Sequence, residues 1–384
     1  MVATRCSVGT IVHNTFSQLL GADSLRSWKG FNAADGLLSI GMEPKTQGLH
    51  HITAITSDAS SAVNFYTRVL GLRLVKKTVN FDDPSAYHLY FGDEKGSPGT
   101  LITFFDWGKA IGFGQVGAGV THHFAFTTRD QGSLANWKAW LEQNDVSVLG
   151  PFDRGSFTSL YFRDPDGLIL EIATPGNGKD YSDALHSELL LKFNNDTAIR
   201  KTSALRMRGI SVEMKLQGLH HVTAFTHGSS QTREFFAGIL NMGLVKDNQR
   251  GSSGTAQQIF GLEGGRPGSM ISFIESPVAP RGTVGVGTVH HIAFAVEDDD
   301  AQLKWREHLL ARGVHVTPVL DRKYFKSTYF REPNGILLEL ATVPPGFGVD
   351  EPMEALGQSL TLPDWLEPRR RAIEASLEPI SLPA

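Results

Sequence analysis

The chain has 384 residues, a formal net charge of −4, 41% hydrophobic residues and 20% charged residues, which is typical of a globular protein with two or three domains. The mild negative charge and the lack of a basic run with interleaved aromatic residues argue against nucleic acid as a partner, and no apolar stretch reaches the roughly 18 residues of a membrane span. Cys6 is the only cysteine, which excludes an internal disulfide or a thiolate metal cage and favours a reducing compartment, the cytoplasm.

Residues 1–44 are expected to form an N-terminal extension. Their first 20 positions contain Arg5 and no acidic residue, with serine and threonine scattered through them. Organelle targeting therefore stays open, but the arginine content is low for a targeting segment. A disordered or loosely docked extension is the favoured interpretation.

The first half of the chain, residues 45–177, contains two similar modules that begin near Leu49 and Thr121. Each opens with His-His in a segment rich in β-branched and aromatic residues, such as HHITAIT, which predicts a strand. Apolar residues at three- and four-residue spacing in SAVNFYTRVLG and SLANWKAWLEQN predict a helix next. Three strands should follow, as in LRLVKKTV, YHLYFG and TLITFF. Asp166-Gly167 predicts a tight turn before the last strand.

After a linker at 178–214, which we expect to be charged and partly helical, the second half at 215–345 repeats the first. KLQGLHHVTAFT lies 170 positions after KTQGLHHITAIT, and YFKSTYFREPNGILLELAT lies 168 positions after SFTSLYFRDPDGLILEIAT. Its modules begin near Leu219 and Val289. A tail at 346–384 contains prolines and predicts a terminal helix. The class is thus α+β, with four βαβββ modules that should pair into two open barrels, because one half-open sheet cannot bury its own face.

Two glutamates stand in otherwise apolar final strands, Glu171 in LILEIAT and Glu339 in LLLELAT. Each follows the second histidine of a His-His pair by 48 residues. A buried carboxylate is costly unless it is paired or bound to a metal. One such acid could face water on an edge strand, but the repeated spacing weakens that alternative. Two imidazoles and a carboxylate suit iron(II), or manganese(II), and leave positions open for a substrate and O₂.

The four modules resemble the vicinal-oxygen-chelate superfamily, which includes glyoxalase I, extradiol dioxygenases and fosfomycin-resistance proteins. A narrower resemblance, to hydroquinone ring-cleaving dioxygenases, is carried by GLHHITAIT, FYTRVLGLRLVKKTVNFDDPSAYHLYFGDEKGSPGTLITFF, GTVHHIAF, DRKYFKSTYFREPNGILLELAT and the tail PPGFGVDE. This resemblance implies a vicinal-oxygen-chelate fold with iron ligands at His51, His291 and Glu339. It also implies accessory residues around the metal, which are His50, Thr53, His290, Arg322 and Tyr329.

One point conflicts with simple strand geometry. Adjacent strand residues face opposite sides of a sheet, so His50 and His51 should not both point into one cavity. A bulge, or a place at the start of the strand, would relax this restriction. We favour His51 as the ligand.

A second candidate ligand set consists of His123, Glu171 and His221, and it departs from the pattern of these relatives. Further residues match the accessory positions around this set: His122, His220, Thr223, Arg154 and Tyr161. Either a second metal site exists or a metal-free set is left from the duplication. Sites within each half, His51–His123–Glu171 and His221–His291–Glu339, are a third arrangement. The resemblance favours pairing the outer modules with each other and the inner modules with each other.

The implied activity is that of a non-haem Fe(II)-dependent, extradiol-type ring-cleaving dioxygenase, whose partners are O₂ and a hydroquinone or another dihydroxylated aromatic. Tyr329 would donate a hydrogen bond or a proton, and Arg322 would stabilise negative charge or hold the substrate. The alternatives are a glyoxalase-I-like metal-dependent isomerase or lyase and a non-catalytic binding protein of the same superfamily. The binding protein would not need a complete His-His-Glu set. The ring substituents and the oligomeric state, a homo-oligomer included, stay open.

Overall fold

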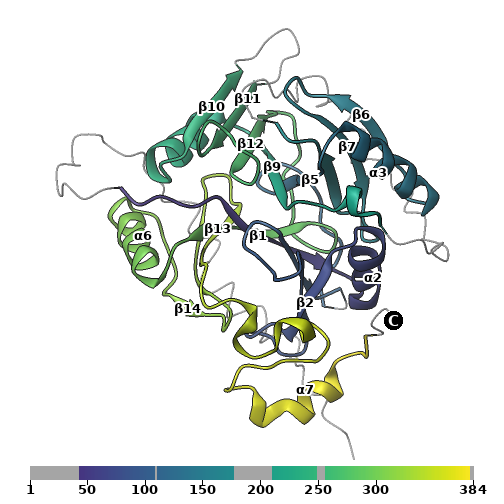
Figure 1. Ribbon diagram of the computed structural model, residues 1–384. Helices are drawn as coiled ribbons and strands as arrows, with labels where there is room; N and C mark the ends of the chain where they lie inside the picture. Colours follow the sequence, from purple (N-terminus) through teal and green to yellow (C-terminus); the bar gives the residue numbers. More distant parts are fainter. Residues whose placement is uncertain (1–42, 109, 177–209, 249–255, 381–384) are drawn as a thin grey trace, which may run out of the picture.

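The computed structural model describes residues 43–380 except 109, 177–209 and 249–255 (Figure 1). Nearly all of the expected N-terminal extension and most of the expected linker lie outside these described residues. Within them, four βαβββ modules follow one another, as the repeats predicted.

The two modules of the first half share the expected element order. The first is formed by β1 (Leu49–Thr56), α2 (Ala59–Asn64), the π-helical turn η3 (Phe65–Val69), β2 (Arg73–Val79), β3 (Tyr87–Gly92) and β4 (Leu101–Asp106). The second is formed by β5 (Thr121–Thr127), α3 (Gln131–Gln143), β6 (Leu149–Asp153), β7 (Thr158–Arg163) and β8 (Ile169–Ala173).

The second half repeats this order after a short 3₁₀ turn, η4 (Val212–Met214). The third module is formed by β9 (Leu219–Thr226), α5 (Ser229–Arg233), the π-helical turn η5 (Glu234–Ile239), β10 (Gly243–Asn248), β11 (Ala256–Gly261) and β12 (Met270–Glu275). The fourth is formed by β13 (Val289–Val296), α6 (Asp299–Ala311), β14 (Leu320–Asp321), β15 (Lys326–Arg331) and β16 (Leu337–Thr342).

An aspartate stands at the start of each of the two longest described helices, α3 and α6, and a tryptophan packs on the inner face of each. Asp130 and Asp298 precede α3 and α6, and each carboxylate accepts a hydrogen bond from a backbone N–H of the first turn. Such caps satisfy donors that have no partner inside the helix. On the inner face, Trp137 of α3 and Trp305 of α6 are fully buried. The apolar spacing of these helices therefore reflects the face that covers the sheets.

The modules pair across the halves of the chain. The first and fourth modules form an eight-stranded sheet in the order β14-β15-β16-β13-β1-β4-β3-β2, which we call the outer barrel. The second and third form a matching sheet in the order β10-β11-β12-β9-β5-β8-β7-β6, which we call the inner barrel. β1 pairs antiparallel with β13, and β5 pairs antiparallel with β9. The predicted fold of two open barrels is confirmed.

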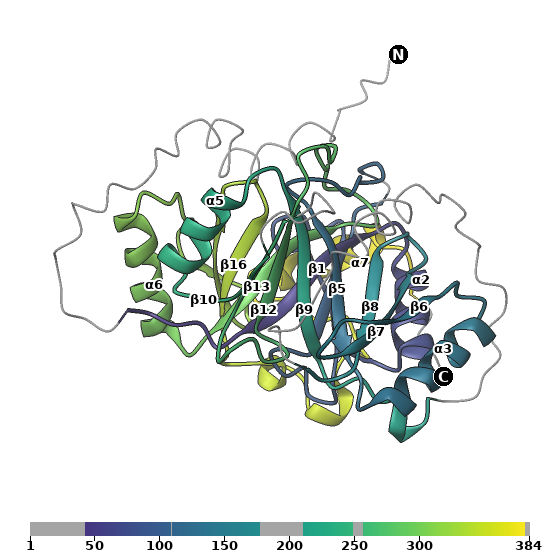
Figure 2. The same cartoon turned by 90° about the horizontal axis from the view of Figure 1, so that it is seen from above.

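The two barrels lie side by side, and contacts between turns and strands join them. Figure 2 shows strands of both sheets at the centre of the molecule, with α5 and α6 on one side and α2 and α3 on the other. The Asp166 carboxylate, in the turn before β8, accepts hydrogen bonds from Thr56 Oγ1 at 2.6 Å and from the Ser57 backbone N–H at 3.1 Å. At the related place, Asn334 Oδ1 accepts a hydrogen bond from Thr226 Oγ1 at 2.7 Å.

The tail crosses the outer barrel beside β2 (Figure 1). It contains three short 3₁₀ turns and the predicted terminal helix: η6 (Phe347–Val349), η7 (Met353–Ala355), η8 (Glu367–Arg369) and α7 (Arg370–Ser376). The fully buried Lys76 ammonium of β2 forms ion pairs with Asp350, at 2.7 Å, and with Glu351. None of the described helices has the length and apolar character needed to cross a membrane.

Candidate metal centre

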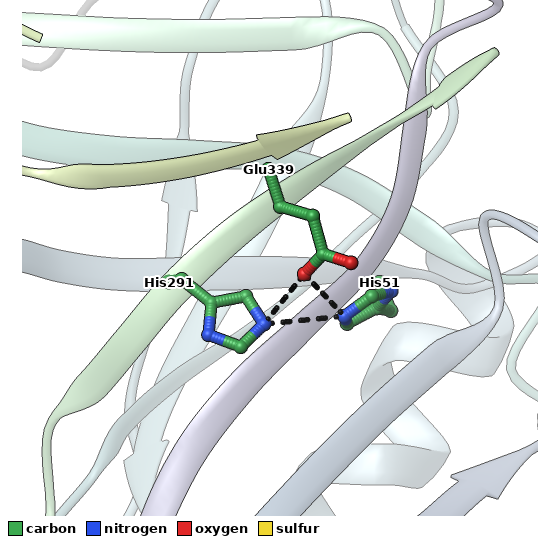
Figure 3. Close-up of side chains that lie close together, drawn as sticks. All are labelled: His51, His291 and Glu339. Atoms are coloured by element: carbon green, nitrogen blue, oxygen red, sulfur yellow. Dashed lines mark hydrogen bonds and ion pairs between the residues drawn. The ribbon is translucent and has the colours of Figure 1, made fainter. Parts of the chain in front are cut away.

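Three predicted ligands from distant parts of the chain meet in the outer barrel. His51 lies on β1, His291 on β13 and Glu339 on β16, and all three side chains are buried. Figure 3 shows the carboxylate of Glu339 pointing between the two imidazole rings. Its Oε2 lies 3.4 Å from His51 Nε2 and 2.9 Å from His291 Nε2, and the two nitrogens are 3.3 Å apart.

These distances fit a shared metal ion. Bonds of about 2.0–2.2 Å from a metal to nitrogen and oxygen place neighbouring ligand atoms about 3 Å apart. Glu339 Oε2 is fully buried, yet no donor among the described residues meets the angles of a hydrogen bond to it, the two nearby imidazoles included. A cation between the three atoms would satisfy it. The donor set of two imidazoles and one carboxylate suits a divalent transition metal.

A β-bulge explains how two adjacent histidines serve one site. In the pairing of β1 with β13, Leu49 and His51 have partners but the register shifts at His50, and a second shift falls at His290. His50 Nδ1 then lies 2.9 Å from His51 Nδ1, and His290 Nδ1 lies 2.8 Å from His291 Nδ1. Metal-binding histidines commonly use the second ring nitrogen in a hydrogen bond that fixes the ring. The first histidine of each pair therefore orients the second.

The protonation states also suit metal binding. Burial alone would raise the pKa of Glu339, but His51 and His291 outweigh it and hold that pKa well below its ordinary value. Ser327 donates a further hydrogen bond to Glu339 Oε1. Burial lowers the pKa of His291, and burial together with His51 lowers the pKa of His50 to about 3. The carboxylate is thus ionised and these imidazoles are neutral at pH 7.

A recess opens beside the outer triad, and its walls are mostly aromatic. Besides ligands and predicted accessory residues, its lining consists of Asn80, Phe81, Asp82, His88, Tyr90, Phe105, Trp107 and Phe325. The sequence reasoning missed these residues. A signal was available for two of them, because His88 and Tyr90 alternate on one face of the predicted strand YHLYFG.

His88 is a third imidazole in this recess. Its Nε2 lies 3.0 Å from Thr103 Oγ1 and its Nδ1 lies 2.9 Å from the Tyr90 hydroxyl. Thr103 Oγ1 in turn lies 2.8 Å from the hydroxyl of the predicted accessory residue Thr53. Burial, with His51 and His291, lowers the pKa of His88 well below its ordinary value. A chain of hydrogen bonds therefore fixes a neutral ring at the wall of the recess.

The remaining two predicted accessory residues also line the recess. Tyr329 on β15 is the cross-strand neighbour of Glu339, so both side chains share one face of the sheet. Burial and Glu339 raise the pKa of Tyr329, which keeps the phenol protonated. The Arg322 guanidinium lies 5.6 Å from the Tyr329 ring centre and forms an ion pair of 2.9 Å with Asp82.

The second predicted set comes together in the inner barrel. Glu171 Oε2 lies 3.2 Å from His123 Nε2 and 3.1 Å from His221 Nε2, and all three residues are buried. Arg154 is also buried, with its guanidinium 5.2 Å from the Tyr161 ring centre.

The alternative of sites within each half is wrong. It required His51 to share an ion with His123, but these residues belong to different barrels because each sheet joins modules from opposite halves. The two groups among the described residues whose side chains could hold a metal ion are His51–His291–Glu339 and His123–Glu171–His221.

Comparison with known proteins agrees with this architecture. The sequence matches the Glyoxalase/Bleomycin resistance protein/Dioxygenase superfamily over residues 48–172 and 218–340. It is 38% identical to MhqO of Bacillus subtilis, provisionally named a ring-cleaving dioxygenase, over 89% of this chain and 99% of that protein. It is 32% identical to a chlorohydroquinone/hydroquinone 1,2-dioxygenase of Sphingobium indicum, over 84% of this chain and 93% of that protein.

Solved structures agree as well. A crystal structure from Bacillus subtilis, provisionally named a dioxygenase, superposes with a TM-score of 0.74 at 36% identity and covers 88% of this chain and 99% of that one. Glyoxalase I from Zea mays superposes with a TM-score of 0.53 at 14% identity, covering 77% and 92%, and shares the fold. The chain belongs to the Glyoxalase/Bleomycin resistance protein/Dioxygenase superfamily.

Proposed function

We propose that this protein is an iron(II)-dependent dioxygenase that opens the ring of a hydroquinone, or of a related dihydroxylated aromatic, with O₂. One observation carries the proposal: three buried ligand atoms converge beside a recess walled by aromatic side chains. The 32% identity to a chlorohydroquinone/hydroquinone 1,2-dioxygenase supports the choice of substrate class. A cytoplasmic location is part of the proposal.

The metal would be held by His51, His291 and Glu339. Iron(II) is favoured over manganese(II) because two histidines and one carboxylate with open positions are the usual ligand set of iron(II) oxygenases. When bound, iron(II) supplies Lewis acidity that lowers the pKa of a phenol and open positions that bring the ring and O₂ together.

The side chains of the recess would bind and orient the substrate. Phe105, Trp107 and Phe325 provide flat apolar surfaces against which an aromatic ring can stack. The Arg322 cation, kept in place by Asp82, balances negative charge that develops on the substrate oxygen. Asp82 is partly exposed, so this ion pair can rearrange when a substrate enters.

Proton handling falls to the phenol of Tyr329. Because burial keeps this phenol protonated, it can donate a hydrogen bond to an oxygen that becomes anionic. In the proposed reaction the bond between a hydroxylated ring carbon and its neighbour breaks, and both atoms of O₂ enter the ring-opened product. Whether the cleavage is of the extradiol type depends on the position of the second hydroxyl group.

Oxygen uptake on two substrates tests this function. The protein is loaded with Fe(II) without air, desalted, and supplied with hydroquinone or catechol in an oxygen electrode. Chelator-stripped protein and Fe(II) alone are the controls, because hydroquinone oxidises slowly by itself. Uptake with hydroquinone, together with loss of the aromatic absorbance, is expected. Uptake with catechol alone would contradict the choice of hydroquinone as the substrate, and no uptake with either would contradict the function.

A further inference from the structure

The inner barrel contains a ligand set that the proposed function does not use. His123 on β5, His221 on β9 and Glu171 on β8 are 0%, 1% and 0% exposed, and their ligand atoms lie within 4.8 Å of one another. We propose that these three residues bind a second divalent transition-metal ion, independently of the outer centre.

The first reason is that, among the described residues, Glu171 has no partner other than the two imidazoles. Neither oxygen of Glu171, nor His123 Nε2, has a hydrogen-bond partner in directional geometry within the described part of the chain. In the outer barrel Ser327 donates to Glu339, whereas the related Ser159 accepts a hydrogen bond from Arg154 Nε at 3.4 Å. The oxygen of Glu171 nevertheless lies 3.1–3.2 Å from both imidazoles. An ion between the three atoms would satisfy a buried charge that the described side chains leave unsatisfied.

The second reason is that each inner ligand histidine, like its outer counterpart, is held by the histidine that precedes it in the chain. His122 Nδ1 lies 2.7 Å from His123 Nδ1, and His220 Nδ1 lies 2.9 Å from His221 Nδ1. The pairing of β5 with β9 also shifts register at His122 and at His220. Both ligand rings are therefore held as in the outer barrel, with Nε2 directed at the carboxylate. A hydrogen bond at the second ring nitrogen is the usual support of a metal-binding histidine.

The donors determine which kind of ion would bind. Two imidazole nitrogens and one carboxylate oxygen suit a divalent first-row transition ion such as Fe(II), Mn(II) or Zn(II). The harder ions Ca²⁺ and Mg²⁺ prefer oxygen ligands. The spacing of about 3 Å between ligand atoms matches metal–ligand bonds of about 2.0–2.2 Å, as in the outer triad.

Metal counting with matched variants tests the proposal. Wild type, Glu339→Gln, Glu171→Gln and the double variant are loaded with Fe(II) without air and desalted, and iron per chain is measured by plasma mass spectrometry. We expect about two ions for wild type, about one for each single variant and about none for the double variant. Iron should also raise the unfolding temperature of Glu339→Gln, since an ion that binds only the folded state stabilises it.

One wild-type ion with none on Glu339→Gln would overturn the inference. This variant leaves the inner set untouched, so the test stands even if Glu171→Gln does not fold. If Glu339→Gln itself does not fold, His291→Ala replaces it for the same reason. The count needs no substrate. Two ions without oxygen uptake would therefore contradict the proposed function and leave this inference intact.

Discussion

Each barrel contains a triad of two histidines and one glutamate that could hold a metal ion, but the side chains beside the two triads differ. In the outer barrel His88 on β3 pairs across the strands with Phe105 on β4, whereas Gln257 and Ile274 occupy these places in the inner barrel. The polar contact is kept, since Gln257 Nε2 donates to Ser272 Oγ at 3.0 Å where His88 contacts Thr103. The aromatic pair of His88 and Phe105 is not kept.

This difference shows that, in a duplicated module, the triad can stay the same while the side chains beside it change. The ligands stand on the central strands of each sheet, where register and burial leave little freedom. His88 on β3 and Phe105 on β4 lie beside the outer triad without belonging to it, so these positions can differ between the barrels. We infer that both barrels keep a metal-binding geometry, and that the outer wall adapts one of them to an aromatic substrate.

The largest loss of activity is expected when the outer carboxylate, Glu339, is replaced. Glu339→Gln should lower the rate of ring cleavage by about a thousandfold or more, because a lost charged ligand removes the metal and its Lewis acidity. The rate of O₂ uptake on hydroquinone measures this. A variant that keeps more than a tenth of the wild-type rate would show that the outer triad is not the reaction site.

A smaller effect is expected for Tyr329→Phe, about a hundredfold on kcat with iron still bound. The raised pKa of Tyr329 fixes the sign of the pH dependence. The phenol stays protonated through its ordinary pKa of 10.0, so the loss should be the same between about pH 6.5 and 9.5. A loss that fades as the pH rises would mean that the phenol ionises in this range.

His88→Gln places the inner residue in the outer wall and so tests the comparison itself. We expect kcat to fall about tenfold, because the side chains of Thr103 and Tyr90 lose the ring that positions them. Iron content should not change. The reverse change, Gln257→His, is the matched control and should leave kcat near that of wild type. An equal fall in kcat for both variants would contradict the comparison, because it would mean that the inner barrel takes part in the reaction as much as the outer barrel does.

The two arginines are expected to differ in how much they stabilise the fold. Arg154→Ala should lower the free energy of unfolding by about 2–4 kcal/mol, because the fully buried side chain packs over the rings of Phe152 and Tyr161. Arg322→Ala should cost about 1 kcal/mol or less, since its partner Asp82 is partly exposed. Denaturant unfolding of both variants decides this. Equal losses in the free energy of unfolding would mean that Arg154 and Arg322 stabilise the fold to the same extent.

Much of this architecture could be predicted from the sequence because the modules repeat. The His-His pairs, the glutamates in apolar strands and the constant spacing indicated four modules and two ligand sets. Pairing across the halves did not follow from spacing, since modules within one half could have paired equally well. It depends on which strands lie side by side, as β1 does with β13.

The recess could not be predicted in the same way. Trp107 and Phe325 lie in different modules, and only the paired sheet brings them to one wall. The bulges at His50 and His290 also arise from strand pairing. Each places one extra residue in its strand and so interrupts the alternation of side chains between the two faces of the sheet. Local periodicity identifies the elements, whereas the surface around a site depends on contacts between distant segments.

The mass of the product formed from hydroquinone shows whether the outer triad supports ring cleavage. The iron-loaded protein should consume one molecule of O₂ per hydroquinone and give a non-aromatic product heavier by two oxygen atoms. Glu339→Gln should give none of it. Benzoquinone, lighter than the substrate by two hydrogens and with its ring intact, would contradict the account.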